Sequence, residues 1–326
     1  MNAPTAALPP FDAQALSTRP DALGGGSRRI TITTPHGPFE VWTQRRGHHP
    51  RIQLLLLHGG PGATHEYFEA FDSYLPEAGI EFIYYDQLGS QRSSQPDIPD
   101  LWELPRFVDE VEQVRLALGL DASNFFLLGH SWGGILATEY ALKHQQHLKG
   151  LVISNMVSSI PGYNRYAQEQ LMPGIPPAVL AEIQAIEAAQ DCENPRYMEL
   201  LVPHHYEHHV LRRPAAQWPD PVQRAFAHIN PKVYIPMQGP SELGASGKLL
   251  NWDRTADLPQ ITVPTLTIGA AHDTMDPAQM QAMAASMPQG RYLHCPNGSH
   301  MAMYDDQVVY MQGLVDFLRS VDAAGR

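Results

Sequence analysis

The sequence predicts an α/β domain with a mostly parallel central sheet, flanked by helices and interrupted by a helical insertion. Short apolar runs bounded by Gly, Pro or Asp alternate with helical patterns, as in buried parallel strands joined by crossover helices. The stretch from 158 to 252 breaks this rhythm, because it is rich in proline and helical patterns and has no convincing strand. The 326 residues are 43% hydrophobic, which is enough to bury a large core.

The expected elements follow in a regular order. A hairpin of 29–34 and 39–43 opens the sheet around a Pro-His-Gly-Pro turn. The remaining strands are expected at Ile52–Leu57, Phe82–Tyr85, Phe125–Leu128, Leu151–Ile153, Thr265–Ile268 and Tyr292–Cys295. The clearest helical patterns are Phe107–Leu118, Gly134–His144, Pro177–Ala189 and Val308–Val321.

Because the sheet pattern resumes after the proline-rich stretch, an insertion explains the layout better than two domains in series. We therefore expect a flexible N-terminal tail at 1–27, a core in two parts at 28–157 and 253–326, and a helical lid at 158–252.

Charge and composition exclude several classes of function. The formal net charge of −12 gives no basic surface for nucleic acid or an anionic membrane, and no apolar run is long enough to span a bilayer. The tail lacks a basic region followed by an apolar stretch, so we expect a cytoplasmic protein without a secretory signal. Two cysteines, Cys192 and Cys295, cannot build a disulfide framework and are expected to be reduced.

The strongest chemical signal is the run GHSWGG at 129–134, directly after a predicted strand and before a predicted helix. This G-x-S-x-G pattern places a serine on a tight strand-to-helix turn, where neighbouring side chains would collide unless they are glycine. Ser131 is therefore the candidate nucleophile.

A serine nucleophile needs a base, and the base needs a carboxylate to orient it. His300 lies in the loop after the last predicted strand and is the expected base, whereas His130 beside the nucleophile is expected only to pack. The loop after the preceding strand offers two aspartates. We assign the orienting role to Asp273 and a helix-capping role to Asp276, which precedes a proline.

A glycine loop, HGGPG at 58–62, follows the strand Ile52–Leu57. An oxyanion needs two backbone N–H donors, and residues without side chains let the backbone approach a substrate. Gly60 and Trp132, the residue after the nucleophile, are the expected donors. A phosphate-binding loop is excluded because no Lys-Ser/Thr pair follows.

These motifs together resemble the proline iminopeptidases, serine peptidases of the α/β-hydrolase fold, and related amino-acid amide hydrolases. The resemblance covers the chain from about residue 28 to its end. Its most specific segments are HGGPG at 58–62, YDQLG at 85–89 with Arg92-Ser93, and GHSWGG at 129–134. In the insertion, ENP at 193–195, HHVLR at 208–212 and MQGPSE at 237–242 also resemble the family.

The resemblance implies a Ser131–His300–Asp273 triad and the release of an N-terminal residue, preferably proline, from short peptides. It also implies that Glu242 holds the free α-ammonium group. The family often has a second Glu directly after the catalytic aspartate, where this chain has Thr274, and Glu207 is a candidate replacement. The substitution leaves an amino-acid amide hydrolase, such as a prolinamidase, or an esterase as alternatives.

No cofactor or metal is expected. The histidines at 204–209 form i, i+4 pairs, but without H-E-x-x-H or another ligand we favour pocket walls or packing. Asp86 and Gln87 are expected to brace the active-site loops. A non-catalytic binding module is disfavoured, because nucleophile, acid, base and oxyanion loop occur in order. The expected partner is a short peptide or small molecule with a free amine, and the oligomeric state is left open.

Overall fold

The computed structural model describes residues 13–325. In this part of the chain, eight strands form one sheet in the order β1-β2-β4-β3-β5-β6-β7-β8. The pairs β1–β2 and β2–β4 are antiparallel, and all other neighbouring strands are parallel. The mostly parallel sheet predicted from the sequence is thus confirmed.

The strands match the predicted runs to within a few residues at each end. Their bounds are β1 Ser27–Thr34, β2 Gly37–Arg46, β3 Gln53–Leu57, β4 Glu81–Asp86, β5 Phe125–His130, β6 Gly150–Ser154, β7 Thr265–Ala270 and β8 Gly290–Cys295.

The α-helices of the described residues fall between the strands and within the insertion. Their bounds are α1 Ala13–Ser17, α2 Leu104–Leu118, α3 Trp132–His144, α4 Ile160–Tyr166, α5 Pro177–Ala188, α6 Pro195–Leu201, α7 Glu207–His209, α8 Asp220–Ala227, α9 Pro231–Met237, α10 Pro277–Ser286, α11 Ala302–Asp305 and α12 Gln307–Ala324.

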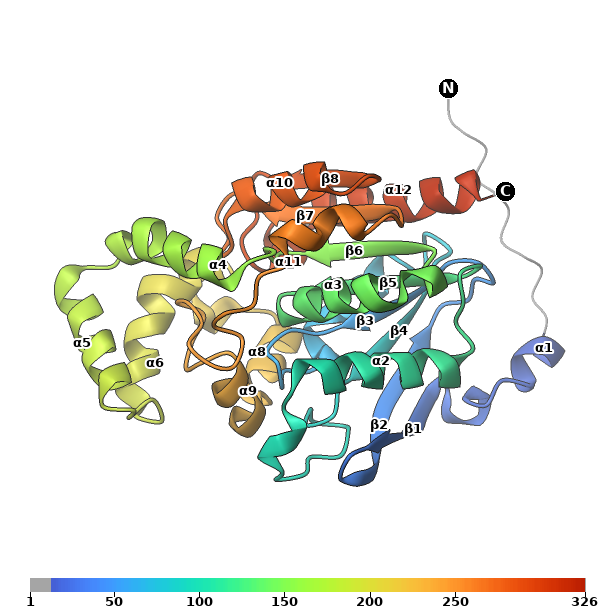
Figure 1. The fold of residues 1–326 in the computed structure, drawn as a ribbon, viewed down its shortest axis with the longest axis horizontal. Coiled ribbons are helices and arrows are strands. Elements are labelled where there is room, and N and C mark those ends of the chain that lie inside the picture. Colours follow the sequence, from blue (N-terminus) through green and yellow to red (C-terminus); the bar gives the residue numbers. More distant parts are fainter. Residues whose placement is uncertain (1–12, 326) are drawn as a thin grey trace.

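Helices α2, α3, α10 and α12 pack on the sheet, while the helices of 158–252 gather at one end of it (left in Figure 1). The two ends of this insertion lie together, because Ser159 and Asp253 form an isolated β-bridge. The Ser159 Oγ also donates to the Asp253 carboxylate at 2.8 Å. A segment whose ends meet in this way can leave and rejoin the sheet without disturbing it.

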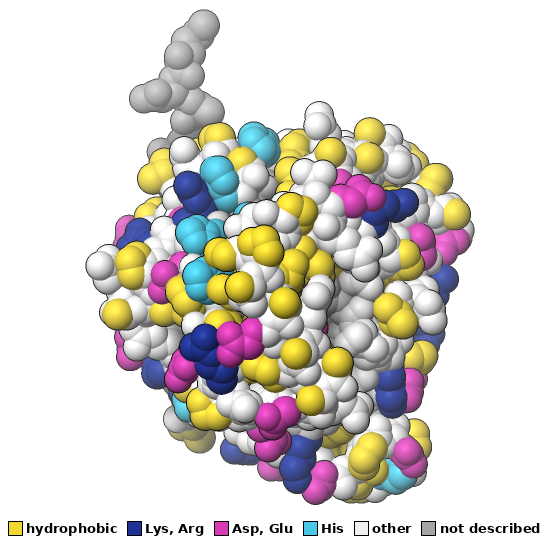
Figure 2. Space-filling model, turned by 90° about the vertical axis from the view of Figure 1, so that its left-hand side faces the viewer, with side chains coloured by type: hydrophobic (Ala, Val, Ile, Leu, Met, Phe, Trp, Pro, Cys, Tyr) yellow, Lys and Arg dark blue, Asp and Glu magenta, His cyan; other side chains and the backbone are white. Residues whose placement is uncertain are grey.

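Figure 2 shows the face of the molecule on the side of the insertion. Basic side chains on this face lie mostly beside acidic ones and do not form a single-sign patch, which agrees with the net charge of −12. This face therefore offers no extended basic surface of the kind that binds a phosphate backbone.

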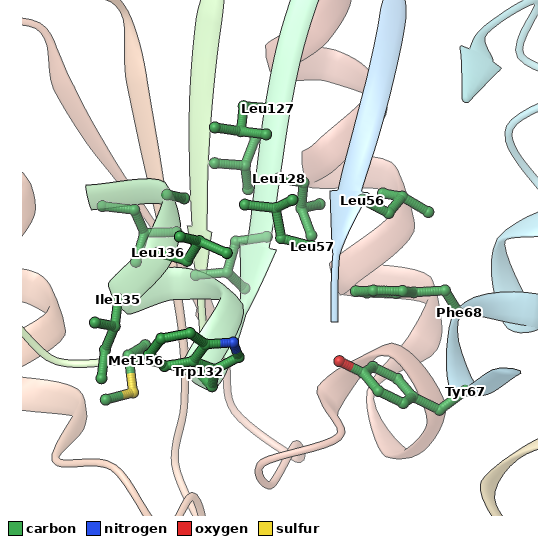
Figure 3. Close-up of a cluster of buried hydrophobic side chains, with 14 of the residues drawn as sticks. Leu56, Leu57, Tyr67, Phe68, Leu127, Leu128, Trp132, Ile135, Leu136 and Met156 are labelled. Carbon is green, nitrogen blue, oxygen red and sulfur yellow. The ribbon is translucent and has the colours of Figure 1, made fainter. Parts of the chain in front are cut away.

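The core is built on the central strands, in which every residue of β3 and β5 is buried. Both faces of these strands are covered, so Leu54–Leu57 and Phe125–Leu128 form continuous apolar runs instead of alternating with polar residues. Figure 3 shows Leu56 and Leu57 of β3 and Leu127 and Leu128 of β5 on neighbouring strands, with Leu136 of α3 nearby. Helix α3 is itself buried along most of its length, which fixes its first residue beside the end of β5.

The predicted flexible tail divides into two parts. Residues 1–12 lie outside the described residues. From α1 to β1 the chain is tied to the sheet by two ion pairs: Arg19 contacts Glu81 at 3.1 Å, and Asp21 contacts Arg45 at 2.9 Å. None of the helices in the described part is long and apolar enough to cross a membrane.

Candidate active site

Ser131 occupies the sharp turn between β5 and α3 that the motif predicts. Its backbone has φ 56° and ψ −128°, a strained conformation for a residue with a side chain. The two flanking glycines are required, because a Cβ on Gly129 would lie 1.9 Å from the Gly133 carbonyl oxygen. A Cβ on Gly133 would lie 2.0 Å from the Leu57 carbonyl oxygen. The turn thus depends on glycine and holds Ser131 at the end of the sheet.

His300 and Asp273 are brought together from loops after β8 and β7. The His300 Nδ1 lies 2.8 Å from the Asp273 Oδ1, and both side chains are buried. A carboxylate at this distance holds the proton on Nδ1 and leaves Nε2 as the basic nitrogen. Ser131 and His300 line the same pocket. The structure therefore brings the three candidate triad residues to one site.

The charge around His300 sets the pH range in which it can act as a base. Burial by itself lowers the pKa of His300, but the Asp273 carboxylate outweighs burial, so the pKa is raised above its usual value of 6.5. The negative charges of Glu242 and Asp305 act in the same direction.

Since only neutral His300 can accept the Ser131 proton, hydrolysis should decline as the pH falls through a pKa above 6.5. We expect the acid limb of kcat/KM to show this midpoint with p-nitrophenyl butyrate, a neutral ester whose own ionisation does not interfere. A limb with its midpoint well below 6.5 would contradict the assignment of His300 beside a charged Asp273.

Asn155 is a functional candidate that sequence reasoning missed. Its Nδ2 donates to the Asp273 Oδ2 at 2.7 Å, and the Met275 N–H donates to Oδ1 at 3.1 Å. The residue directly follows β6 and has φ 52°, a left-handed conformation that asparagine tolerates. Both carboxylate oxygens of Asp273 are therefore held, and the carboxylate cannot turn away from His300.

Replacing Asn155 with glycine keeps the left-handed backbone available and removes the amide donor. We expect kcat to fall about tenfold or more with little change in KM, because a buried hydrogen bond to a charged group is lost beside the base. The half-buried Asn194, whose side chain caps α6 outside the pocket, is a control when replaced with alanine. Unchanged kcat in Asn155→Gly would show that Asp273 needs no such support.

The other loop aspartate, Asp276, caps α10 as expected, since its side chain accepts the Ala278 N–H at 2.9 Å. Thr274 is fully buried and contacts the triad instead of the pocket. Its Oγ1 lies 3.2 Å from the His300 Nδ1 and 3.3 Å from the Asp273 Oδ1.

The glycine loop provides the expected place for an oxyanion. A Cβ on Gly59 would lie 3.0 Å from the Ser131 Cβ, so the loop runs directly past the nucleophile. Gly60 has φ +105°, which a residue with a side chain rarely adopts. Within the described part of the chain, neither the Gly60 nor the Trp132 N–H has an acceptor. Both donors are thus available to a developing negative charge.

Asp86 and Gln87 link the loops around the nucleophile. The Asp86 Oδ1 accepts both the backbone N–H and the Nδ1–H of His65 at 2.8 Å. The Gln87 amide donates to the His58 carbonyl oxygen at 3.1 Å and accepts the Trp132 Nε1–H at 2.9 Å. These contacts brace the glycine loop against the start of α3.

A pocket of about 440 Å³, including its mouth, contains Ser131, His300 and Glu242. The insertion supplies one wall of this pocket with Val210, Ala225, Phe226, Ile229, Tyr234 and Glu242. A larger groove of about 1610 Å³ lies between residues 164–193 and 235–247 of the insertion. Because that groove contains none of the triad residues, we assign the chemistry to the smaller pocket.

Glu242 is held rigidly in this pocket. Its Oε1 lies 2.5 Å from the Tyr234 hydroxyl, and its carbonyl oxygen accepts from the Tyr163 hydroxyl at 2.7 Å and the His205 Nε2–H at 2.9 Å. Burial, followed by the charge of Glu242, raises the pKa of Tyr234 well above its usual value of 10, so this hydroxyl stays protonated and donates to the carboxylate. The result is a fixed, partly buried anion near the nucleophile.

The structure does not bring Glu207 into the pocket. The Glu207 Oε1 accepts the Ala215 N–H at 2.6 Å, and this residue is not part of the pocket lining. Glu207 instead fixes the chain after α7, and we leave it out of the proposed substrate site.

The histidines of 204–209 do not converge on a metal position. Three of them donate to backbone carbonyls: His205 to Glu242, His208 to Pro203, and His209 to His272. Elsewhere in the described residues, Glu112, His144 and His147 lie close enough to share an ion. Arg115 already binds both carboxylate oxygens of Glu112, so we assign no metal there.

Known proteins resemble this chain in both sequence and structure. The family described as alpha/beta hydrolase fold matches residues 53–307. A proline iminopeptidase of Flavobacterium johnsoniae is 54% identical over 90% of this chain and 98% of its own length. The chain belongs to the proline iminopeptidase family. A second member, from Elizabethkingia meningoseptica, is also 54% identical, with the same coverage of both chains.

The solved structure of a proline iminopeptidase from Mycobacterium smegmatis gives the same result. It superposes with a TM-score of 0.80 at 30% identity, covering 92% of this chain and all of the other. The comparisons thus confirm the family and fold that the sequence motifs predict, and the proline iminopeptidase relatives match the chain across both the sheet and the insertion.

Proposed function

We propose that this protein is a proline iminopeptidase that releases an N-terminal residue, preferably proline, from short peptides through an acyl-enzyme. The observation that carries the proposal is the position of Glu242, an anion in the same pocket as Ser131 and His300. A carboxylate held in a partly enclosed site is the natural partner for the α-ammonium group of a peptide. The 54% identical relatives support the same activity.

The proposed reaction begins when the Ser131 Oγ attacks the carbonyl carbon of the N-terminal residue and His300 takes its proton. The carbonyl π electrons move to the oxygen, where the Gly60 and Trp132 N–H groups stabilise the negative charge. When the tetrahedral intermediate collapses, the C–N bond breaks and His300 protonates the leaving amine. Water then attacks the acyl-enzyme with His300 as base, which releases the amino acid and restores Ser131.

The insertion is proposed to act as a lid that sets the specificity. Its apolar residues Val210, Phe226 and Ile229 face the pocket beside Glu242. A prolyl ring would contact this apolar wall while its ammonium group meets the carboxylate. Because an internal peptide bond has no free amine for Glu242, the lid excludes endopeptidase activity.

The cytoplasmic location remains a prediction from the sequence.

A side-by-side rate comparison tests the proposal. The substrates are L-proline p-nitroanilide, L-prolinamide, alanine p-nitroanilide and p-nitrophenyl butyrate. We expect the highest kcat/KM on the proline anilide among the amine-bearing substrates, because it combines the apolar ring with the ammonium group. A higher kcat/KM on alanine p-nitroanilide would contradict the preference for proline.

The buried Thr274 favours a second candidate, an amino-acid amide hydrolase on the same scaffold. It stands where the family often has a second Glu, and its hydroxyl contacts the triad instead of the pocket. Higher kcat/KM on prolinamide than on the proline anilide would favour this candidate, while the triad assignment would stand.

A further inference from the structure

A continuous run of hydrogen bonds joins the glycine loop to the base, by way of two side chains that the proposed reaction does not use. The Gly59 N–H donates to the Tyr67 hydroxyl oxygen at 2.6 Å. That hydroxyl lies 3.1 Å from the His130 Nδ1, and the His130 Nε2 lies 2.8 Å from the His300 carbonyl oxygen. We call these four residues the Gly59–His300 chain.

Each bond in this chain can have only one direction. The His300 carbonyl oxygen can only accept, so the proton of His130 must be on Nε2. In the neutral ring Nδ1 is then an acceptor, and the Tyr67 hydroxyl must donate to it. The Tyr67 oxygen keeps a lone pair for the Gly59 N–H. Moving the His130 proton to Nδ1 would leave the Nε2 lone pair facing the His300 carbonyl oxygen, so two buried acceptors would face each other.

The surroundings preserve this direction. Burial is the main cause that lowers the pKa of His130 to about 3, so its ring remains neutral beside His300. Burial also raises the pKa of Tyr67 well above its usual value of 10, so its hydroxyl keeps its proton. The exposed fractions are 3% for Tyr67 and 2% for His130, so both side chains are buried although they border the pocket.

Tyr67 and His130 are held by neighbouring rings. Tyr67 lies in the 3₁₀ helix His65–Ser73, and its own carbonyl oxygen accepts the Tyr304 hydroxyl at 2.8 Å. Its ring centroid is 5.2 Å from that of His130, and the His130 centroid is 4.9 Å from that of His300. Figure 3 shows the Tyr67 hydroxyl just beyond the end of β3, where the glycine loop begins.

The chain acts on the two parts of the site that must be aligned for acyl transfer. Because the Gly59 N–H is turned toward Tyr67, it cannot serve the oxyanion, and the next N–H, on Gly60, remains available. At the other end, His130 holds the backbone of His300, from which the catalytic ring projects. A displacement of either part by a few tenths of an ångström weakens a transition state that needs both.

We propose that Tyr67 and His130 are positioning residues, which keep the oxyanion donors and the base in register through the Gly59–His300 chain. The proposal rests on the proposed acyl-transfer function, but it does not depend on which acyl substrate is preferred. It gives His130 a defined role, whereas the sequence alone indicates only packing.

The test uses Tyr67→Phe, His130→Leu and the double variant, with His130→Gln as the conservative replacement that keeps an N–H able to reach the His300 carbonyl. The readouts are kcat and KM on L-proline p-nitroanilide, and the second-order rate at which a fluorophosphonate labels Ser131. That reagent needs the nucleophile, base and oxyanion hole but no amine recognition. If the peptidase assignment is wrong, the wild type turns over the anilide poorly but is still labelled. If this proposal is wrong, the variants are labelled as fast as the wild type.

We expect Tyr67→Phe and His130→Leu each to lower both kcat and the labelling rate about tenfold, with KM within about twofold of the wild type. In the double variant, kcat and the labelling rate should fall by much less than the product of the two single-variant factors, because both substitutions break the same Gly59–His300 chain. His130→Gln should recover part of the labelling rate. Tyr140→Phe is the matched control, since it removes another buried hydroxyl bond, to Glu112, outside the site. Labelling within twofold of wild type, or fully multiplicative losses, would overturn the proposal.

Discussion

Replacing Ser131 with alanine is expected to lower kcat by about 10⁴-fold or more on every substrate that the enzyme accepts. The reason is that the Oγ forms the bond to the acyl group, and no other hydroxyl in the pocket is placed on a turn of this kind. Folding should be retained, because alanine removes one oxygen and leaves the flanking glycines in place. Steady-state turnover of L-proline p-nitroanilide and the thermal unfolding midpoint measure the two effects.

Ser286→Ala is the control for this experiment, since the Ser286 hydroxyl donates to the Ala282 carbonyl of its own helix α10 and is exposed. Its kcat should equal that of the wild type. If Ser131→Ala kept near-normal turnover, the acyl-enzyme mechanism would have to be abandoned.

Replacing Glu242 with glutamine is expected to lower kcat/KM on L-proline p-nitroanilide by about 100-fold, with p-nitrophenyl butyrate affected only a few-fold. The amide retains the shape of the side chain and its contact with Tyr234, so the main loss is the negative charge that faces the ammonium group. Removing one partner of a desolvated charge pair leaves the other uncompensated, which accounts for the size of the effect.

Glu207→Gln provides the matched control, because Glu207 lies on the same insertion but its carboxylate accepts the Ala215 N–H outside the pocket. We expect nearly wild-type kcat/KM on both substrates. Equal losses on the anilide and the ester in Glu242→Gln, or a larger loss in Glu207→Gln, would be incompatible with ammonium recognition by Glu242.

The parts of the structure that could be predicted from the sequence are those encoded locally. The apolar run Phe125–Leu128 predicts a buried strand, and the glycines around Ser131 predict the turn that follows it, because both signals lie within a few neighbouring residues. Ser131, Asp273 and His300 could likewise be assigned from the sequence, because each lies in the turn or loop directly after a predicted strand. The structure places all three at one end of the sheet.

The supporting contacts could not be predicted, because they join residues far apart in the chain. Asn155 is 118 positions from Asp273, and His130 is 170 positions from His300. A single asparagine after a strand occurs in many loops, so nothing in the sequence distinguishes Asn155. Whether Glu207 could replace the second acidic residue missing at Thr274 depended on the path of the insertion, which no local pattern fixes. Only the folded chain separates Glu242, which lines the pocket, from Glu207, which accepts the Ala215 N–H.

The most direct test of the account is the ratio of kcat/KM for L-proline p-nitroanilide to that for N-acetyl-L-proline p-nitroanilide. The two substrates have the same ring and leaving group, and they differ in the free amine that Glu242 is proposed to hold. We predict a ratio on the order of 10² or more for the wild type, and a ratio much closer to one in Glu242→Gln. A wild-type ratio near one would contradict an exopeptidase that recognises the N-terminal ammonium group.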